Sequence, residues 1–574
     1  MPRYAAPLLV VVAFAAGFAC TTTTVAPPPA PAPAAAAPAA PPAPDEPLPT
    51  PIGATLLDGL GTYHRVITTT SPDAQRWFDQ GLMLSYGFNH DAAERSFLKA
   101  TELDPDCAMC WWGAALVLGP HVNATMDPAN NDKAWMRLQK ARALAPRVDL
   151  WEQAYIEALS ARYAEKPAAD RASLDRAYAN AMNALARKLP DDVDAATLYA
   201  EALMDLSPWN YYTAEGKPRG NTPEIVRVLE SVFARNPDHA GALYLYIHAV
   251  EASDKAERGA AAADRLRELV PGSGHLVHMP AHIYTRVGRY HDAAIANQQA
   301  IKADDAYLAT CQPAPGVYPL GYVPHNHHFL WWAASMEGAS ATALAAAEET
   351  AKRAWLPDLI KSPGFEFLQD FWVTPLKAKV QFGRWAEIVA TPQPSADLPY
   401  PVAVWHFAQG MAAVEQQRLD AAQTHLAELA KAAADPQFDK YFVGPDRALS
   451  RTLKVAERVL AGELAGARKD SAGAVAAFEQ AVKLEDANLY FEPPLWHQPA
   501  RHYLGAALLA AKKPAQAERV YRADLQRNPE NGWALYGLAR SLQAQGKKKE
   551  AAEVEERQRK AWQHADVQLT ASVI

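Results

Sequence analysis

Cysteine is scarce in this chain. Only four cysteines occur in 574 residues, and Cys20 stands far from Cys107, Cys110 and Cys311. Small secreted domains that rely on several disulfides are much denser in cysteine. A disulfide framework is therefore excluded as the main source of stability.

Long basic runs are absent as well. The formal net charge is -8, and the short run Lys547 to Lys549 is interpreted as a solvated turn. Proteins that bind nucleic acid concentrate lysine and arginine on one face to neutralise phosphates. We therefore expect no nucleic-acid partner.

Several catalytic and nucleotide-binding motifs are missing. The chain has no P-loop, no dinucleotide-binding glycine motif, no Gly-x-Ser-x-Gly elbow and no EF-hand loop. It also lacks a series of short apolar runs of period two bounded by hairpin turns. These absences exclude catalysis by those routes and predict an all-α fold.

The N-terminus has the features of an export signal. Arg3 precedes an apolar stretch from Ala5 to Ala19, and Cys20 follows it. The segment resembles a bacterial lipoprotein signal, although Gly17-Phe18 stands where an aliphatic and then a small residue are usual. The resemblance implies a signal peptide over residues 1–19, a lipid on Cys20, and a membrane anchor in the cell envelope, either periplasmic or on the outer membrane. Ordinary signal cleavage beside an alanine is the alternative.

The next segment is predicted to be a disordered linker over residues 20–52. It consists mainly of Thr, Ala and Pro with hardly a charge. Such a composition cannot bury enough apolar surface to offset the entropy of ordering and favours extended polyproline II conformations. We expect a spacer between the membrane and a folded body.

The folded body contains a repeat. Between Ala74 and Cys107, large, small and turn-forming residues occupy characteristic positions: Trp77, Gly81, Ala93, Phe97, Ala100 and Pro105. Pro237 and Pro271, which close later copies, are 34 residues apart. This pattern resembles the tetratricopeptide repeat, and the helix at residues 275–284 is similar to one in bacterial repeat lipoproteins of no known activity.

The resemblance implies an all-α solenoid of helix pairs that forms a right-handed superhelix with irregular loop insertions. Each pair has an apolar stripe that only a neighbouring pair can cover. The expected divisions are a first repeat array at 53–310, a Pro/Gly loop at 311–324, central helical repeats at 325–400, and a second array at 401–574. Long irregular loops in such a solenoid are often functional.

Histidines concentrate in the middle of the chain, where nine of the seventeen fall between His239 and His328. At about 100° per residue, His275, His278 and His282 share one helix stripe, although Pro280 is expected to interrupt the helix. A preceding helix carries Tyr244, His248 and Glu251 on one stripe, and a later helix carries His325, His328 and Trp332. His248 and His282 are 34 residues apart, so they are predicted to lie side by side, with Glu201 in the equivalent position of an earlier repeat.

These stripes are predicted to line one concave groove. In tetratricopeptide proteins that surface binds extended peptides or protein tails, so the resemblance implies a peptide or protein partner and a binding scaffold. The segment from Glu492 to His497 is interpreted as a further edge of the groove.

A metal site is the alternative for the same groove. Histidines one helical turn apart, with carboxylates nearby, are ligand types for Zn or Cu, and an open coordination position would activate water for hydrolysis. The candidate ligands are His248, His275, His278, His282, His325 and His328. The zinc-protease spacing of two histidines around a glutamate is absent, so we expect a binding protein rather than an enzyme.

Cys107 and Cys110 form a two-spaced pair at the start of a predicted helix. A thioredoxin-type site needs a βαβ context that this chain lacks. In an exported protein a local disulfide is favoured, while buried thiols and a soft-metal site remain alternatives.

Overall fold

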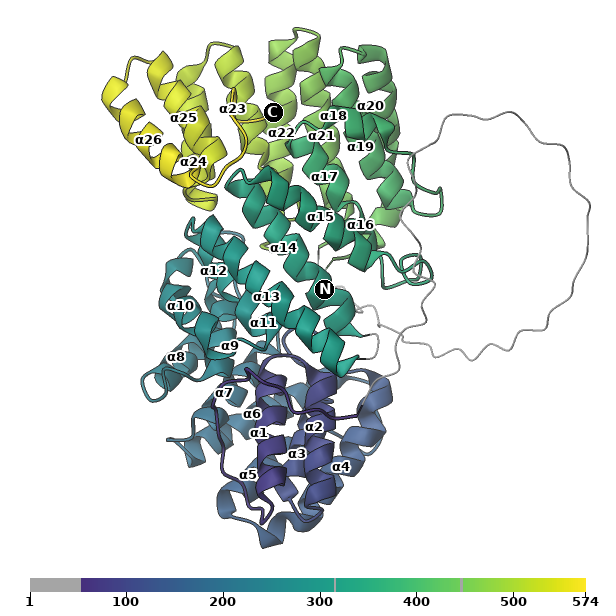
Figure 1. Cartoon of the computed structure of the whole chain (residues 1–574), viewed down its shortest axis with the longest axis vertical. Coiled ribbons are helices and arrows are strands. Elements are labelled where there is room, and N and C mark those ends of the chain that lie inside the picture. Colours follow the sequence, from purple (N-terminus) through teal and green to yellow (C-terminus); the bar gives the residue numbers. More distant parts are fainter. Residues whose placement is uncertain (1–52, 314–315, 444–446) are drawn as a thin grey trace, which may run out of the picture.

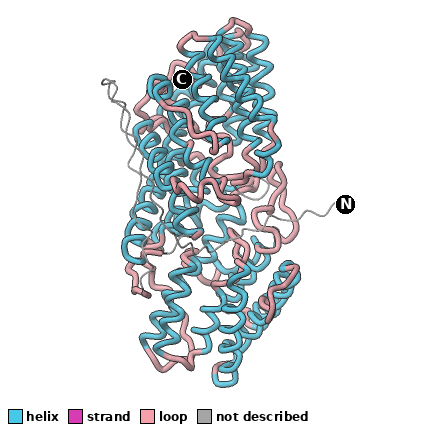
Figure 2. Tube along the Cα trace, turned by 90° about the vertical axis from the view of Figure 1, so that its right-hand side faces the viewer, coloured by secondary structure: helices cyan, strands magenta, loops and turns pink. Residues whose placement is uncertain are grey.

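The computed structural model describes residues 53–313, 316–443 and 447–574. The predicted signal peptide, Cys20 and the Pro/Ala-rich linker lie outside the described residues. Within the described part there is no β-strand, only isolated bridges such as His121 with Ala124. The fold is an all-α solenoid of helix pairs, as the repeat pattern predicted (Figures 1 and 2).

The first half begins with an extended segment, residues 53–71, that lies against the early helices. Its helices are α1 (Pro72–Tyr86), α2 (His90–Leu103), α3 (Ala108–Leu116), η1 (Pro128–Asn130), α4 (Asn131–Leu144), η2 (Ala145–Arg147), α5 (Leu150–Ser160), α6 (Arg171–Lys188), α7 (Val193–Met204), α8 (Thr222–Phe233), α9 (Ala240–Val250), η3 (Ala256–Gly259) and α10 (Ala260–Leu269).

The centre of the chain carries most of the clustered histidines. Its helices are α11 (Gly274–His278), α12 (Pro280–Arg286), α13 (Tyr290–Cys311), the π-helix η4 (Tyr318–Tyr322), α14 (Val323–Met336), α15 (Ser340–Ala354), α16 (Phe367–Trp372), α17 (Thr374–Gln381) and α18 (Trp385–Ala390).

The C-terminal part repeats the helix-pair arrangement. Its helices are α19 (Pro399–Glu415), α20 (Leu419–Ala434), η5 (Pro436–Lys440), α21 (Ser450–Ala467), α22 (Ser471–Asp486), α23 (Ala500–Ala510), α24 (Pro514–Arg527), α25 (Gly532–Ala544) and α26 (Lys548–Ala561). No helix of the described residues is both long enough and apolar enough to cross a bilayer.

A glycine and aromatic contact recurs where helix pairs stack. The Phe97 ring lies so close to Gly81 and Gly113 that a Cβ on either glycine would be 2.8 or 2.4 Å from it. Tyr521 lies in the same way between Gly505 and Gly537. In both cases the aromatic residue is sixteen positions from each glycine in the sequence. The missing side chains allow the large ring of one helix to enter the space between the two helices that flank it.

The apolar interior forms two main clusters. One extends from Ile67 through the central helices to Phe382 and includes Trp533, and the other extends from Val373 to Val554. The C-terminal segment connects the two parts, because Asp566 accepts hydrogen bonds from the backbone N–H groups of Ser340 and Ala341 at the start of α15. A disulfide joins Cys107 to Cys110 at the start of α3, and Cys311 is a buried free thiol.

Candidate functional site

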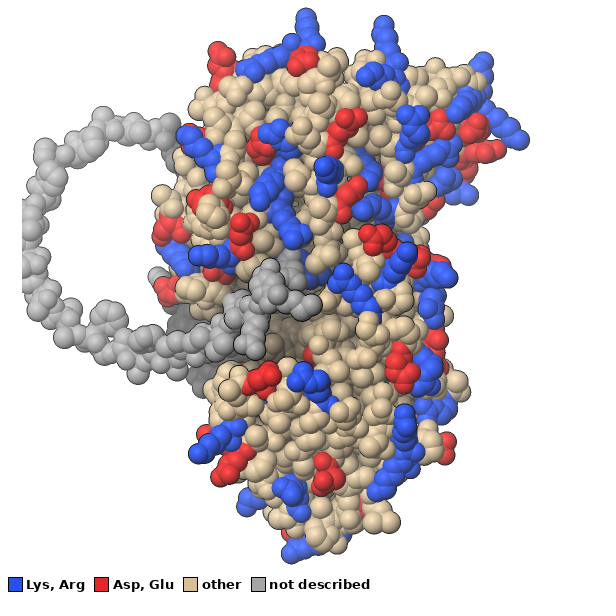
Figure 3. All heavy atoms as spheres, turned by 180° about the vertical axis from the view of Figure 1, so that it is seen from behind, with Lys and Arg blue, Asp and Glu red and all other residues tan. Residues whose placement is uncertain are grey.

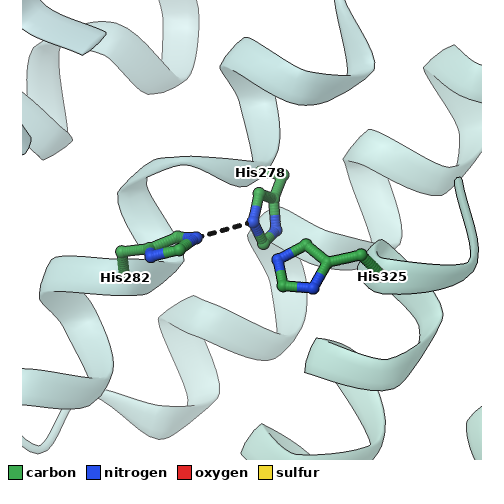
Figure 4. Close-up of side chains that lie close together, drawn as sticks. All are labelled: His278, His282 and His325. Carbon is green, nitrogen blue, oxygen red and sulfur yellow. Dashed lines mark hydrogen bonds between the residues drawn. The ribbon is translucent and has the colours of Figure 1, made fainter. Parts of the chain in front are cut away.

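Three histidines from three central helices converge (Figure 4). His278 ends α11, His282 lies in α12 and His325 lies in the first turn of α14. One nitrogen from each ring lies within 4.8 Å of the others, a separation that could hold one metal ion. Sequence periodicity predicted that these three residues would meet.

The break at Pro280 shapes this site locally. Proline lacks the N–H that would continue α11, so α11 ends at His278 and α12 begins at Pro280. The two rings nevertheless stay on one side of the chain, with centroids 4.8 Å apart. The Phe329 ring, one turn after His325, lies about 5 Å from the centroids of both rings and covers them with an apolar surface.

The hydrogen position on His278 follows from its neighbour Asn297 on α13. The Asn297 amide nitrogen donates to the Ala293 carbonyl at 2.8 Å, so its Oδ1 faces the histidine. His278 Nδ1 lies 2.7 Å from that oxygen. Because an amide oxygen only accepts, His278 Nδ1 carries the hydrogen and its Nε2 has a free lone pair when the ring is neutral.

Two carboxylates fix the hydrogen position on His282 in the same way. Its Nδ1 lies 2.6 Å from Glu251 Oε2 and 3.0 Å from Glu492 Oε2. Glu251 caps the end of α9, whereas Glu492 comes from the loop between α22 and α23. His282 Nδ1 therefore donates, and its Nε2 also presents a lone pair in the neutral ring.

The two Nε2 atoms face each other at 2.9 Å (Figure 4). Two lone pairs at this distance repel unless a cation lies between them. The cation can be a proton, which makes one ring an imidazolium, or a metal ion. In a tetrahedral zinc site with Zn–N bonds near 2.0 Å, ligand nitrogens lie about 3.3 Å apart, so the observed separation is close to that of a ligand pair.

The three rings differ in pKa. Burial lowers the pKa of His282, but the charges and hydrogen bonds of Glu251 and Glu492 outweigh burial and raise the pKa to about 10. Burial lowers the pKa of His278 and His325, and neighbouring histidines lower it further. The arrangement thus holds a single positive charge beside two neutral imidazoles.

A second donor group adjoins the first. His248, Glu251 and His282 also place one donor atom each within 4.8 Å of one another. His248 Nδ1 lies 2.7 Å from Glu251 Oε1, and His248 Nε2 lies 2.9 Å from the Tyr244 hydroxyl. The Glu251 carboxylate therefore accepts from two histidines, and their hydrogen bonds and positive charge hold its pKa at about 2 against the effect of burial.

His275 lies beside these groups. Its Nε2 is 3.3 Å from the Tyr244 hydroxyl, and its ring packs against Tyr322 with centroids 4.2 Å apart. Its Nδ1 is buried without a hydrogen-bond partner.

The side chains are enclosed rather than spread along an open groove. Tyr244, His248, Glu251, His275, His278 and His282 are each at most 4% exposed, and only His325 of the three converging histidines is half-buried. Glu492 and His325, from distant parts of the chain, are packed against the stripe of α11 and α12. The sequence placed His325 in the groove and the segment from Glu492 to His497 at its edge, but it did not indicate that they would enclose the stripe.

Three predicted residues do not join this cluster. His328 packs against Trp331 and Phe371, and neither of its ring nitrogens has a partner. Trp332 donates from Nε1 to the His497 carbonyl at 3.1 Å. Glu201 is half-buried, and its charge interacts with the Arg162 guanidinium.

Sequence reasoning missed Asn297, Asn123 and Tyr322. Asn123 lies in the loop after α3, where its Nδ2 donates to the Tyr244 hydroxyl at 2.9 Å. None of the three belongs to a histidine stripe. The only signal for Tyr322 was its spacing of three residues from His325.

Comparison with known proteins agrees with the repeat fold. Residues 74–107 and 508–568 each match a family model described as tetratricopeptide repeat. None of the curated proteins compared with the chain matches it.

Two solved structures match the chain at low similarity. The APC/C hetero-tetramer Cut9-Hcn1 is 12% identical with a TM-score of 0.31, over 84% of this chain and 76% of that chain. The human IFIT1 dimer with m7Gppp-AAAA is 12% identical with a TM-score of 0.30, over 86% of this chain and 91% of that chain. These values are too low to carry over what either protein binds.

Proposed function

We propose that this chain is a helical-repeat protein that binds one divalent transition-metal ion, Zn²⁺ or Cu²⁺, through His278, His282 and His325. The observation that carries the proposal is the 2.9 Å approach of two Nε2 atoms whose partner Nδ1 atoms both donate to oxygen. Imidazole nitrogen is a preferred ligand of both metals.

The surroundings of the ligands support this assignment. In metal sites the second ring nitrogen of a histidine usually donates to a carboxylate or carbonyl, which fixes the ring and makes it more basic. Asn297 and Glu251 supply those acceptors to His278 and His282. Three protein ligands also leave a coordination position open, which is the arrangement in which a bound water is activated.

Charge balance favours a divalent ion. Glu251 and Glu492 are buried beside the three imidazoles, 1% and 7% exposed. A metal ion displaces the His282 proton, so in the loaded site all three imidazoles are neutral. With both carboxylates ionised, their charge is then negative by two, and a divalent cation neutralises it. A buried uncompensated charge is strongly destabilising, so loading the site removes that penalty.

The test is metal stoichiometry. Untagged protein is purified, stripped with a chelator, and titrated with Zn²⁺ by calorimetry alongside elemental analysis of the unstripped material. We expect one ion per chain, and loss of that ion in the double variant His278→Ala/His282→Ala with an unchanged helical circular dichroism spectrum.

A matched control exists elsewhere in the chain. His406 and His425 also bring two ring nitrogens to 3.0 Å, but on the half-buried surface of α19 and α20. His406→Ala/His425→Ala should keep the ion. A wild-type protein that binds none, or equal loss in both double variants, would refute the metal site.

A protein-binding role is the second candidate, because two segments match tetratricopeptide models. Stacked repeats present long surfaces that suit extended peptides. A peptide array probed with the folded protein tests this role. If the repeats form one binding surface, the peptides that bind should compete with one another. Peptides that bind independently would contradict this role.

The N-terminal pattern supports a location in the cell envelope. The apolar stretch before Cys20 supports export, and the cysteine supports a lipid anchor in the cell envelope. The Pro/Ala-rich linker would then separate the metal site from the membrane surface.

A further inference from the structure

A chain of hydrogen bonds runs from the metal site to unpartnered acceptors, and its proton positions can be assigned from one end. The starting point is Glu251, an ionised carboxylate that can only accept. His248 Nδ1, at 2.7 Å from Glu251 Oε1, must therefore carry a hydrogen. Neutral His248 then has a lone pair on Nε2.

The next partner is Tyr244. Its hydroxyl lies 2.9 Å from His248 Nε2 and supplies the hydrogen that this lone pair needs. A phenol has one hydrogen, so the Tyr244 oxygen can only accept from its two other neighbours. Those neighbours are Asn123 Nδ2 at 2.9 Å and His275 Nε2 at 3.3 Å.

These hydrogen bonds fix the tautomer of His275 and the orientation of the Asn123 side-chain amide. His275 carries its hydrogen on Nε2, which leaves Nδ1 as a bare acceptor. Asn123 must direct its NH₂ group at Tyr244, which leaves Oδ1 as a bare acceptor. Among the described residues, both acceptor atoms are shielded from solvent and lack a hydrogen-bond donor. The Tyr322 hydroxyl lies beside the Asn123 amide, and no described acceptor takes its hydrogen.

These unpartnered groups adjoin the metal ligands. His275 precedes His278 by three residues, and the two rings stack with centroids 5.9 Å apart. Tyr322 precedes His325 by the same three residues and packs on the His275 ring. Buried polar groups without partners are rare in folded proteins, and several beside an open coordination position are typical of a ligand site.

We infer that this chain binds a small amide-like ligand, with the ligand oxygen on the metal ion and its N–H donating to one of the bare acceptors, His275 Nδ1 or Asn123 Oδ1. The inference rests on the proposed metal site. An amide or hydroxamate fits because it presents a metal-binding oxygen and an N–H donor a few ångströms apart, and Tyr322 can donate to a further oxygen.

The experiment compares two probes on zinc-loaded protein. Acetohydroxamic acid has the N–H, whereas N-methylacetohydroxamic acid carries a methyl group in its place. Their dissociation constants are measured by calorimetry and divided by the corresponding constants for aqueous Zn²⁺, which removes the intrinsic difference between the probes. We expect the N–H probe to bind about tenfold more tightly after this correction, the effect of roughly one buried hydrogen bond.

Two variants test whether the preference for the N–H probe depends on His275 Nδ1 or on Asn123 Oδ1. His275→Gln keeps a donor toward Tyr244 but lacks the Nδ1 acceptor, and Asn123→Leu removes the other acceptor from a half-buried loop. The variant that lacks the acceptor engaged by the N–H should reduce the preference to about twofold with the zinc content unchanged, while the control His425→Gln keeps the full preference.

Equal binding of the two probes to wild-type protein, or a preference that survives in both variants, would overturn the inference. Loss of zinc from wild-type protein would instead refute the metal site, so elemental analysis of the same samples separates the two failures.

Discussion

The positions of the hydrogens on His278 and His282 decide what the histidine cluster can bind. Asn297 and Glu251 hold a hydrogen on Nδ1 of His278 and of His282, so in the neutral rings both Nε2 atoms point lone pairs at one position. Without these acceptors either ring could adopt the other tautomer and place a hydrogen where a metal ion would bind. The oxygen partners therefore matter as much as the ligands.

The first prediction concerns Glu251. Replacing it by glutamine keeps the volume but removes the negative charge and the second accepting oxygen that orient His282 and His248. We expect Glu251→Gln to weaken Zn²⁺ binding by about 10- to 100-fold, measured by calorimetric titration. Glu337→Gln, another buried glutamate after α14, is the control and should leave the affinity unchanged. Equal affinities for the two variants would contradict the orienting role.

At the scale of elements, the glycine and aromatic contacts set how closely helix pairs approach. Gly462 on α21 lies against Phe478 of α22, where a Cβ would be 2.5 Å from the ring. Gly466, one turn later on the same helix, is exposed, and its Cβ would meet nothing nearer than 3.9 Å. The two positions differ in packing but share the helix.

The second prediction uses this pair. Gly462→Ala should lower the free energy of unfolding by about 1–3 kcal/mol because the ring must shift. Gly466→Ala should leave it unchanged or raise it by up to about 1 kcal/mol because alanine favours the helix. Urea denaturation of both variants measures the difference, and destabilisation of similar size at both sites would contradict the packing argument.

The N-terminal segment is tied to the repeats by a buried ion-pair network. Asp194 in α7 bonds Arg65 of that segment at 2.5 Å, His239 at 3.0 Å and the hydroxyl of Tyr86. Burial alone would raise the pKa of Asp194, but the His239 hydrogen bond and the Arg65 charge outweigh it and hold the pKa well below the usual range.

The third prediction follows from that shift. Because the folded pKa lies below the unfolded value of about 3.9, Asp194 stabilises the fold above that pH, and the contribution disappears as pH falls through the folded pKa. Asp194→Asn should lower the free energy of unfolding by about 3 kcal/mol at pH 7. The deficit should shrink below about pH 4 in denaturation curves recorded across pH, and a deficit independent of pH would contradict the electrostatic origin.

At the scale of the whole molecule, the face seen in Figure 3 carries mixed charge, with lysine and arginine interspersed among aspartate and glutamate over both halves of the chain. Buried charge gathers in the interior, where carboxylates and imidazoles meet between the early repeats, the central helices and the loop that carries Glu492.

The fourth prediction concerns anchoring of the molecule. If Cys20 bears a lipid, Cys20→Ala should move the protein from the membrane fraction to the soluble fraction in its native host. Immunoblots of the two fractions measure the change, with intact-mass analysis of the wild-type N-terminus as the control. Wild-type protein found in the soluble fraction without a lipid would exclude the anchor.

Spacing along the sequence was enough to predict the helix pairs and the stripe of His275, His278 and His282. These features depend on local spacing: sixteen residues between a glycine and its aromatic partner, and three or four between side chains on one helix face. The break at Pro280 was equally local, because a proline beyond the first turn of a helix removes a backbone N–H and interrupts the helix.

The side chains around that stripe come together through long-range packing. Glu492, whose segment the sequence predicted as an edge of the groove, arrives from a loop far along the chain, Asn297 from the next long helix and Asn123 from an early loop. No periodicity relates these positions to the histidines, because their meeting depends on how separate repeats stack and where loops fold back. Burial of the cluster, its tautomers and its unpartnered acceptors all follow from those long-range contacts.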